Sequence, residues 1–176
     1  ARRIFTETLA PAHFPIKEIE VIVKQIIDDI LAQKEIAAGL ILLRDYDETM
    51  FVHCVNVCAY AVALGHQAGL RHQELYELGV GALLHDIGKI NLPSPQPDNP
   101  SDRLGPEEGD AYRQHAMQGY QFLSHAPGVS MVSAHVALQH HERWDGLGFP
   151  RQLRGETIHL FGRITAVCNV FDHLTS

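Results

Sequence analysis

Two clusters of histidine and acidic residues could do chemistry in this chain of 176 residues. The first, residues 85–89, reads His-Asp-Ile-Gly-Lys, and the second, residues 140–150, reads His-His-Glu-Arg-Trp-Asp-Gly-Leu-Gly-Phe-Pro. A carboxylate has two oxygens and can bridge two metal ions, and imidazoles are common ligands of the same ions. Two doublets of ligand-type side chains therefore indicate a binuclear metal site, the apparatus of a two-metal phosphohydrolase.

The spacing of these residues suggests how they share a site. His85 and Asp86 come at the end of an apolar, helical stretch, where burying them without partners would be costly, and metal ligation removes that cost. Lys89 lies at i+4 from His85 and i+3 from Asp86, so on a helix it faces the same cavity, although it could simply pair with Asp86. His140 and His141 are about 100° apart on a helix, so two ions, or one ion and a substrate, can be served by neighbours.

Most of the twelve histidines need no function. Polar or terminal surroundings predict solvent exposure for a group made up of His13, His66, His72, His125, His159 and His173. We assign His135 to packing or to indirect support of the site. The candidate ligands that remain are His53, His85, His115, His140 and His141.

Helical periodicity of apolar residues runs through the chain, and strand-like alternation is scarce. We therefore predict an all-α helical bundle, with helices over residues 16–38, 49–69, 73–86, 106–124 and 129–142 and from 157 onward. Prolines between residues 93 and 100 predict a loop within the domain. The amphipathic first helix is either a cover for the core or a dimer-forming lead-in, and the first interpretation is favoured.

The composition restricts the class of protein. A formal charge of -7 argues against DNA as a partner, because backbone-driven binding needs a basic surface. The odd number of cysteines, Cys54, Cys58 and Cys168, predicts buried thiols of a cytoplasmic protein. No apolar run approaches the ~18 residues of a membrane span, and no signal peptide is present. The start at Ala1 and the end inside an apolar-periodic segment indicate a piece of a longer protein, so we expect truncation at the C-terminus.

Together the motifs resemble the HD-GYP family, a branch of the HD metal-dependent phosphohydrolase superfamily that hydrolyses the bacterial second messenger cyclic di-GMP. The resemblance runs from about residue 16 to the end and includes His53 in residues 51–57 and His115 in residues 112–115. It implies a phosphohydrolase domain over residues 39–176, preceded by an N-terminal segment and lead-in helix over residues 1–38.

The resemblance also implies partners. The substrate would be cyclic di-GMP, converted to pGpG, GMP or both by two-metal activation of a bridging water. Signalling proteins would bind at the Gly-Phe-Pro loop, residues 148–150. An upstream sensory or regulatory domain is expected, and a homodimer is one option.

Roles for individual residues follow from the same resemblance. One ion would be held by His53, His85 and Asp86, and Asp86 would bridge to a second ion held by His115, His140 and His141. Lys89 would act with Asp86 in catalysis by stabilising charge on the scissile phosphate. Further contacts with the substrate are expected from Arg143, Asp145, Gly146 and Arg151. The ions would be iron or manganese, which suits imidazole and carboxylate ligands without thiolate.

Three positions depart from the family pattern. Asn169 stands where the family has its last ligand, an Asp, and its neutral amide oxygen should hold the first ion less tightly. Asp172, three residues later, is expected to make a structural hydrogen bond and not to replace that ligand. Phe149 replaces the Tyr of Gly-Tyr-Pro and loses only a hydroxyl. Thr49 stands where some members carry a Glu that supports a third ion, so we expect two ions.

Two other functions stay open at this point. Asn169 favours a catalytically weakened receptor that binds cyclic di-GMP and signals through partner proteins. An HD hydrolase acting on another nucleotide is the other alternative, and the signature at residues 140–150 argues against it.

Overall fold

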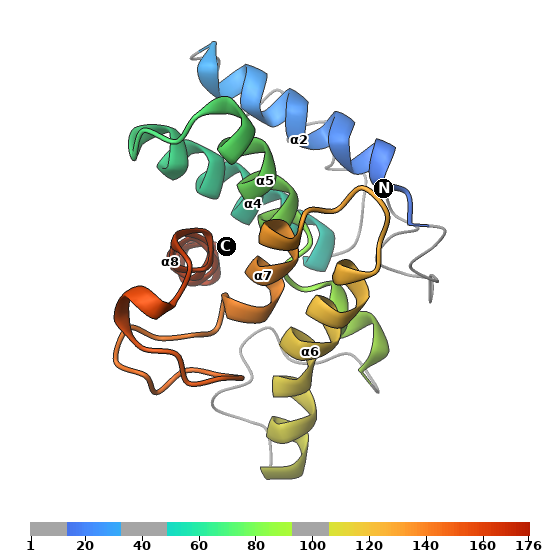
Figure 1. Ribbon diagram of the computed structural model, residues 1–176, viewed down its shortest axis with the longest axis vertical. Coiled ribbons are helices and arrows are strands. Elements are labelled where there is room, and N and C mark those ends of the chain that lie inside the picture. Colours follow the sequence, from blue (N-terminus) through green and yellow to red (C-terminus); the bar gives the residue numbers. More distant parts are fainter. Residues whose placement is uncertain (1–13, 33–48, 93–105) are drawn as a thin grey trace.

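The computed structural model describes residues 14–32, 49–92 and 106–176, and over these ranges it contains helices and no strand (Figure 1). The all-α prediction is confirmed. The division proposed at residue 38 lies outside the described residues. In chain order the elements are α2 (Ile16–Leu31), α4 (Thr49–Gln67), α5 (His72–Leu83), the 3-10 helix η2 (Ile87–Asn91), α6 (Pro106–Ser124), α7 (Met131–Gln139), the 3-10 helix η4 (Gly155–Thr157) and α8 (Leu160–Thr175).

Helix α5 lies at the centre of the bundle, in contact with α2, α4 and α7, while α8 packs on α4 and α7 (Figure 1). A small residue allows the tight approach of α7. A Cβ atom added at Gly81 would lie 2.6 Å from Val136 Cγ2, closer than real side chains come. The close packing of α5 and α7 matters for function, because the two signature doublets follow the ends of these helices.

Helix α2 covers one side of this core. Its residues Ile19, Val23 and Ile27 are fully buried, at the i, i+4, i+8 spacing of one helical face, and α2 contacts α4 and α5. The core-covering interpretation of this helix is confirmed for that face. The three cysteines are buried and free, as predicted. Within the described residues, no helix is both long and apolar enough to cross a membrane.

Both signature doublets lie just past a helix, and the prediction that they sit within helices is wrong. Helix α5 ends at Leu83 and α7 ends at Gln139. After α5 the chain tightens into a 3-10 turn, in which the Lys89 N–H donates to the Asp86 carbonyl at 2.9 Å. On a continuous helix, neighbours would point about 100° apart. The turn instead allows His85 and Asp86 to face the same site.

Gly88 fixes this turn against α6. A Cβ at this position would collide with the backbone of His115 and lie 2.7 Å from the Gly119 nitrogen. The glycine of the His-Asp-Ile-Gly-Lys run therefore allows the turn to rest directly on the helix that carries His115. This close approach brings the third predicted ligand beside the first doublet.

Candidate metal centre

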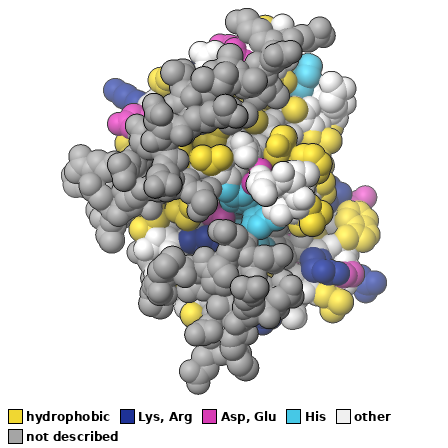
Figure 2. Space-filling model, turned by 180° about the vertical axis from the view of Figure 1, so that it is seen from behind, with side chains coloured by type: hydrophobic (Ala, Val, Ile, Leu, Met, Phe, Trp, Pro, Cys, Tyr) yellow, Lys and Arg dark blue, Asp and Glu magenta, His cyan; other side chains and the backbone are white. Residues whose placement is uncertain are grey.

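The six predicted ligands with the clearest sequence signals come together in the structure. The ligand atoms of Asp86, His115, His140 and His141 lie within 4.8 Å of one another, and those of His53, His85 and Asp86 do the same. They come from α4, the turn after α5, α6 and the end of α7. Figure 2 shows histidine side chains beside an acidic one near the middle of one face of the molecule. Asp86 is common to both groups.

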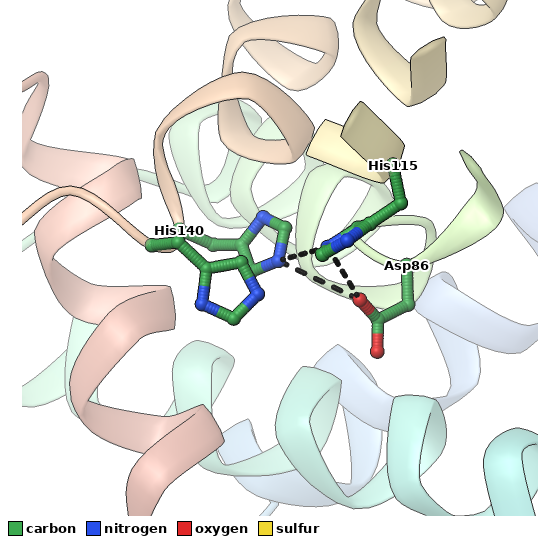
Figure 3. A group of neighbouring side chains, drawn as sticks. Asp86, His115 and His140 are labelled. Atoms are coloured by element: carbon green, nitrogen blue, oxygen red, sulfur yellow. Dashed lines mark hydrogen bonds and ion pairs between the residues drawn. The ribbon is translucent and has the colours of Figure 1, made fainter. Parts of the chain in front are cut away.

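The two oxygens of Asp86 face different groups. Oδ1 lies 3.3 Å from His115 Nε2 and 3.5 Å from His140 Nε2 (Figure 3). Oδ2 lies 3.3 Å from His85 Nε2 and 3.8 Å from His53 Nε2. A carboxylate that presents one oxygen to each of two sets of imidazoles has the arrangement of a bridging ligand between two cations.

Backbone contacts fix the tautomer of three of the imidazoles. The Nδ1 atoms of His85, His115 and His140 each pair with the carbonyl of the residue three positions earlier, at 2.7 Å for His85 and 2.9 Å for His140. A carbonyl only accepts, so Nδ1 carries the hydrogen, and in the neutral imidazole Nε2 then keeps a lone pair. Metal-binding histidines are commonly oriented in this way. All three Nε2 atoms lie close to Asp86.

His53 is oriented by a side chain instead. Its Nδ1 donates to Oδ2 of the buried Asp172 on α8 at 2.7 Å, and its Nε2 faces Asp86. The structural hydrogen bond predicted for Asp172 is confirmed. A carboxylate that accepts from the distal nitrogen of a ligating histidine both fixes the ring and makes the other nitrogen a better donor to a metal.

Several of the site atoms are buried without hydrogen-bond partners, which fits a metal. Unpartnered atoms include His53 Nε2, His85 Nε2, His141 Nε2 and Asp86 Oδ1. Asp86 Oδ1 lies 3.3 Å from His115 Nε2 and 3.5 Å from His140 Nε2 without a hydrogen bond to either. Buried polar atoms in native proteins nearly always have partners. Cations placed among these lone pairs would satisfy them.

The protonation states agree with this fit. Burial, assisted by the neighbouring His85, lowers the pKa of His53 to about 4. Burial lowers the pKa of His140 to about 3 and that of His141 well below its ordinary value. These imidazoles are therefore neutral at pH 7, the form that binds metals. The donor set of neutral imidazoles around one shared carboxylate fits divalent transition-metal ions.

Lys89 forms an ion pair with Asp86, one of the two arrangements that the sequence allowed. Its Nζ lies 2.6 Å from Asp86 Oδ2 and 5.3 Å from the centre of the Tyr112 ring. Burial alone would lower the pKa of Lys89, but the Asp86 carboxylate outweighs burial and raises it. A permanently charged ammonium thus lies at the oxygen that faces His53 and His85.

The loop after the second doublet is clamped by Glu142, a role that sequence reasoning missed. The Glu142 side chain is buried and accepts the backbone N–H groups of Arg151 at 2.7 Å and Leu153 at 2.9 Å. Within this loop, the Phe149 ring stacks on His141 with centroids 4.4 Å apart and planes 20° from parallel. The stacking needs only the ring, so the loss of the Tyr hydroxyl leaves this contact intact.

The sequence of the chain matches the HD domain family over residues 33–176. The chain belongs to the HD domain family. It is 38% identical over 155 residues to a cyclic di-GMP phosphodiesterase of Pseudomonas aeruginosa, covering 88% of this chain and 37% of that protein. It is 39% identical over 140 residues to the cyclic di-GMP phosphodiesterase response regulator RpfG of Xanthomonas campestris pv. campestris, covering 79% and 36%.

A third relative is named for a different substrate. The chain is 35% identical over 123 residues to 3'3'-cGAMP-specific phosphodiesterase 2 of Vibrio cholerae, covering 69% of this chain and 23% of that protein. The chain spans at most 37% of the length of these three relatives.

A solved structure confirms the fold of the HD domain. The HDG"Y"P protein Bd1817 of Bdellovibrio bacteriovorus superposes with a TM-score of 0.71, covering 89% of this chain and 51% of that one at 24% identity. At this identity the likeness concerns the fold alone. Together with the family match and the relatives, it confirms the resemblance to the HD-GYP branch.

Apart from Lys89, the residues predicted to contact the substrate lie in the loop that follows the second doublet. Arg143 and Asp145 pair with each other at 2.7 Å, and Asp145 also accepts the Leu147 N–H at 2.9 Å. Gly146 turns the loop with a φ of +80°, and Arg151 is exposed. These contacts shape the loop itself, so a role for these four residues in substrate binding stays a prediction.

Asn169 lies on α8, where its side chain is buried and its Oδ1 has no partner. It is one helical turn before Asp172, so both face the side of α8 that meets His53. Its role as a ligand stays a prediction.

Neither of the two groups of candidate ligands contains a thiol, which agrees with the expected imidazole and carboxylate ligands.

Among the remaining histidines, one has a contact with the candidate site that the sequence did not predict. His66, His72, His125 and His159 are exposed as predicted, His135 packs on the Tyr120 ring with centroids 5.0 Å apart, and His13 lies outside the described residues. His173 is exposed too, but its ring centre lies 4.6 Å from that of His53. Its position four residues after Asn169 on one helical face was the signal that could have identified it.

Proposed function

We propose that this HD domain hydrolyses cyclic di-GMP, releasing pGpG, GMP or both. The observation that carries the proposal is Asp86, whose two oxygens each face a separate group of neutral, oriented imidazoles. Relatives named cyclic di-GMP phosphodiesterases, 38% and 39% identical over most of the chain, support this substrate.

We assign one ion to His53, His85, Asp86 and Asn169, and the other to Asp86, His115, His140 and His141. Iron or manganese suits these nitrogen and oxygen ligands, and Asn169 would contribute its unpartnered amide oxygen. Ions bound here would neutralise phosphoryl oxygens and lower the pKa of a coordinated water, so that a nucleophile forms at neutral pH.

The charge of the site suits an anionic substrate. Asp86 is the one carboxylate among the proposed ligands, so two divalent cations would bring more positive charge than the protein neutralises. Lys89 adds a further positive charge beside them. The chain as a whole carries a formal charge of -7, so attraction of a phosphodiester has to come from this local field.

The protein's own side chains position the reactants. Asp172 and three backbone carbonyls hold the rings of four histidines, and Phe149 stacks on His141. Lys89 Nζ lies at Asp86 Oδ2, and with Asp86 engaged as a metal ligand the Lys89 ammonium would be available to contact a phosphate oxygen. A fixed positive charge at the scissile phosphate stabilises the charge that develops there.

A hydrolysis assay tests the proposal. Protein reconstituted with manganese or iron is incubated with cyclic di-GMP, and pGpG and GMP are separated by chromatography. We expect turnover by the wild type, none by Asp86→Ala, and unchanged turnover by Asp110→Ala, which removes an exposed acid on α6. Absence of hydrolysis with every metal tested would reject the enzymatic proposal.

Asn169 favours a second candidate, a weakened enzyme that acts as a receptor of cyclic di-GMP. A neutral amide compensates less positive charge than a carboxylate, so the first ion would be held less tightly. Asn169→Asp distinguishes the two functions. A large gain in hydrolysis supports the receptor, and no gain in an active wild type rejects it.

The cGAMP-specific relative raises the question of which cyclic dinucleotide is preferred. We propose cyclic di-GMP, because the cyclic di-GMP phosphodiesterases above align over more of the chain. Parallel assays on cyclic di-GMP and 3'3'-cGAMP measure the ratio of kcat/KM. A ratio in favour of cGAMP would overturn the assignment of the substrate.

We also propose signalling proteins as partners at the loop around residues 148–150, in a cytoplasmic protein with an upstream regulatory domain. The neighbouring side chains Trp144 and Leu147 are 60% and 77% exposed, which supports a contact surface. A homodimer stays a prediction. Chemical crosslinking of the full-length protein in cells, compared with Trp144→Ala, measures whether this loop engages a partner.

A further inference from the structure

The two ligand groups around Asp86 are unequal. One consists of Asp86 with three histidines, His115, His140 and His141, whereas the other has Asp86 with only His53 and His85. Transition-metal ions in such sites take four or more ligands. The smaller group therefore has room for a further protein ligand.

Two side chains of α8 lie within one turn of Asp172, the acid that bonds His53. Asn169 Oδ1 is buried and unpartnered. One turn later, the His173 ring lies against His53, with centroids 4.6 Å apart and planes at 74°. The pair His85 and His140, on the two sides of Asp86, shows nearly the same relation, with 4.9 Å and 78°. The His173 ring is thus placed against His53 in nearly the same way as the His140 ring is placed against His85.

The tautomer of His173 also suits a ligand. Its Nδ1 pairs with the Asn169 carbonyl at 2.8 Å, so Nδ1 carries the hydrogen and Nε2 keeps its lone pair. The same kind of backbone contact orients His85, His115 and His140. The ring nitrogens of His173 lie outside the group of ligand atoms within 4.8 Å, so His173 would have to move towards the ion, and its exposure on the last turn of α8 leaves room for this.

We propose that His173 is a further ligand of the metal position served by His53, His85 and Asp86, binding through Nε2. This inference rests on the binuclear site of the proposed function. An imidazole nitrogen at this position offsets the weak, neutral oxygen of Asn169. The first ion is then held by residues of α4, the turn after α5, and α8.

Metal affinity, and not turnover, tests the proposal. Competition with a chromophoric chelator measures the dissociation constant of each manganese ion in the wild type, in His173→Ala and in His173→Phe, which keeps the ring packing without a nitrogen. We expect both variants to weaken one of the two ions at least 10-fold, by analogy with the loss of partners that only support a ligand, and to leave the other unchanged.

A matched histidine provides the control. His125 is exposed and its Nδ1 bonds a carbonyl four residues earlier at 2.8 Å, as in His173, but it lies just after α6, ten residues beyond His115. His125→Ala should bind both ions as the wild type does. Thermal unfolding of the metal-free variants confirms that each is folded.

The outcomes separate this inference from the proposed function. Wild-type affinity for both ions in His173→Ala and His173→Phe would overturn the role of His173 and leave the binuclear enzyme standing. A wild type that binds no ion would overturn both. Selective loss of one ion in both variants supports the inference whether or not cyclic di-GMP is hydrolysed.

Discussion

His53 Nδ1 donates a hydrogen bond of 2.7 Å to Asp172 Oδ2, across the contact between α4 and α8. This bond fixes the ring so that Nε2 faces the shared carboxylate of Asp86. Helix α8 therefore contributes to the site through Asp172, which supports the ring of His53. The same helix carries an amide, Asn169, at the position of the expected ligand.

Replacing Asp172 should weaken one metal ion. In Asp172→Ala, His53 loses the acceptor that orients it, so we expect a 10- to 100-fold loss of affinity for the ion that His53 serves. Asp172→Asn should lose less, because the amide oxygen can still accept from Nδ1. Chelator competition measures both. Equal affinities in the wild type and Asp172→Ala would contradict this supporting role.

Replacing Lys89 should separate metal binding from catalysis. Lys89→Met removes the cation at Asp86 Oδ2 and keeps most of the side-chain volume, so metal affinity should be maintained or increase. We expect kcat to fall about 10²- to 10³-fold, as when one stabilising charge or donor is removed from a transition state.

Metal content and turnover are measured on the same preparation, with Lys24→Met, an exposed lysine of α2, as control. A loss of activity fully explained by loss of metal would show that Lys89 acts only on the site's assembly. An unchanged kcat would remove it from the catalytic residues.

The metal-free protein should lose stability in mild acid. The pKa of His53 is about 4 and that of His140 about 3 in the folded state, against about 6.5 in an unfolded chain. Between pH 6.5 and 4 the unfolded state binds more protons, so the free energy of unfolding decreases as pH falls. The expected slope is about 1.4 kcal/mol per pH unit for each histidine.

Urea denaturation in chelator at pH 7, 6 and 5 checks this slope. His140→Gln removes one titrating group and should flatten the dependence, whereas His125→Ala should not. Equal stability at pH 7 and pH 5 would contradict the neutral, buried state of these histidines.

Replacing Glu142 should lower the free energy of unfolding, because Glu142 clamps the loop after the second doublet. Glu142→Ala leaves the N–H groups of Arg151 and Leu153 without their acceptor, at a cost of about 1–3 kcal/mol for each group that stays buried. Urea denaturation measures the change. Glu156→Ala, which removes an exposed acid in η4, should stay within about 0.5 kcal/mol of the wild type. A similar small effect for Glu142→Ala would contradict the clamp.

The sequence predicted the helical fold and the grouping of six candidate ligands because both depend on local patterns. Apolar periodicity identified α4, α6 and α8 closely and the start of α2, but α2 ends at Leu31 and not at residue 38. The paired His-Asp and His-His signatures indicated the candidate site. The ends of α5 and α7 were wrong by several residues, because the apolar pattern continues through Leu84 although the backbone has already turned. These two helices end where the backbone hydrogen bonding changes, and not where the apolar pattern stops.

Contacts made across the bundle could not be read from the chain. Glu142 looks like one more exposed acid in a charged loop until its two backbone donors, nine and eleven residues later, are seen. His173 sits among polar residues at the end of the chain, which predicts exposure. That exposure is real, yet its ring lies on His53, and only the docking of α8 on α4 brings the two together.

The metal content of Asp86→Ala tests the central claim most directly. After reconstitution with manganese and removal of free metal, elemental analysis should find about two ions per wild-type chain, as expected for a two-metal site. His53→Ala and His141→Ala should each retain about one ion, because each removes a ligand of one position. Asp86→Ala should lose both, since its carboxylate serves both positions. A wild type without metal, or an Asp86→Ala variant that keeps both ions, would contradict the account.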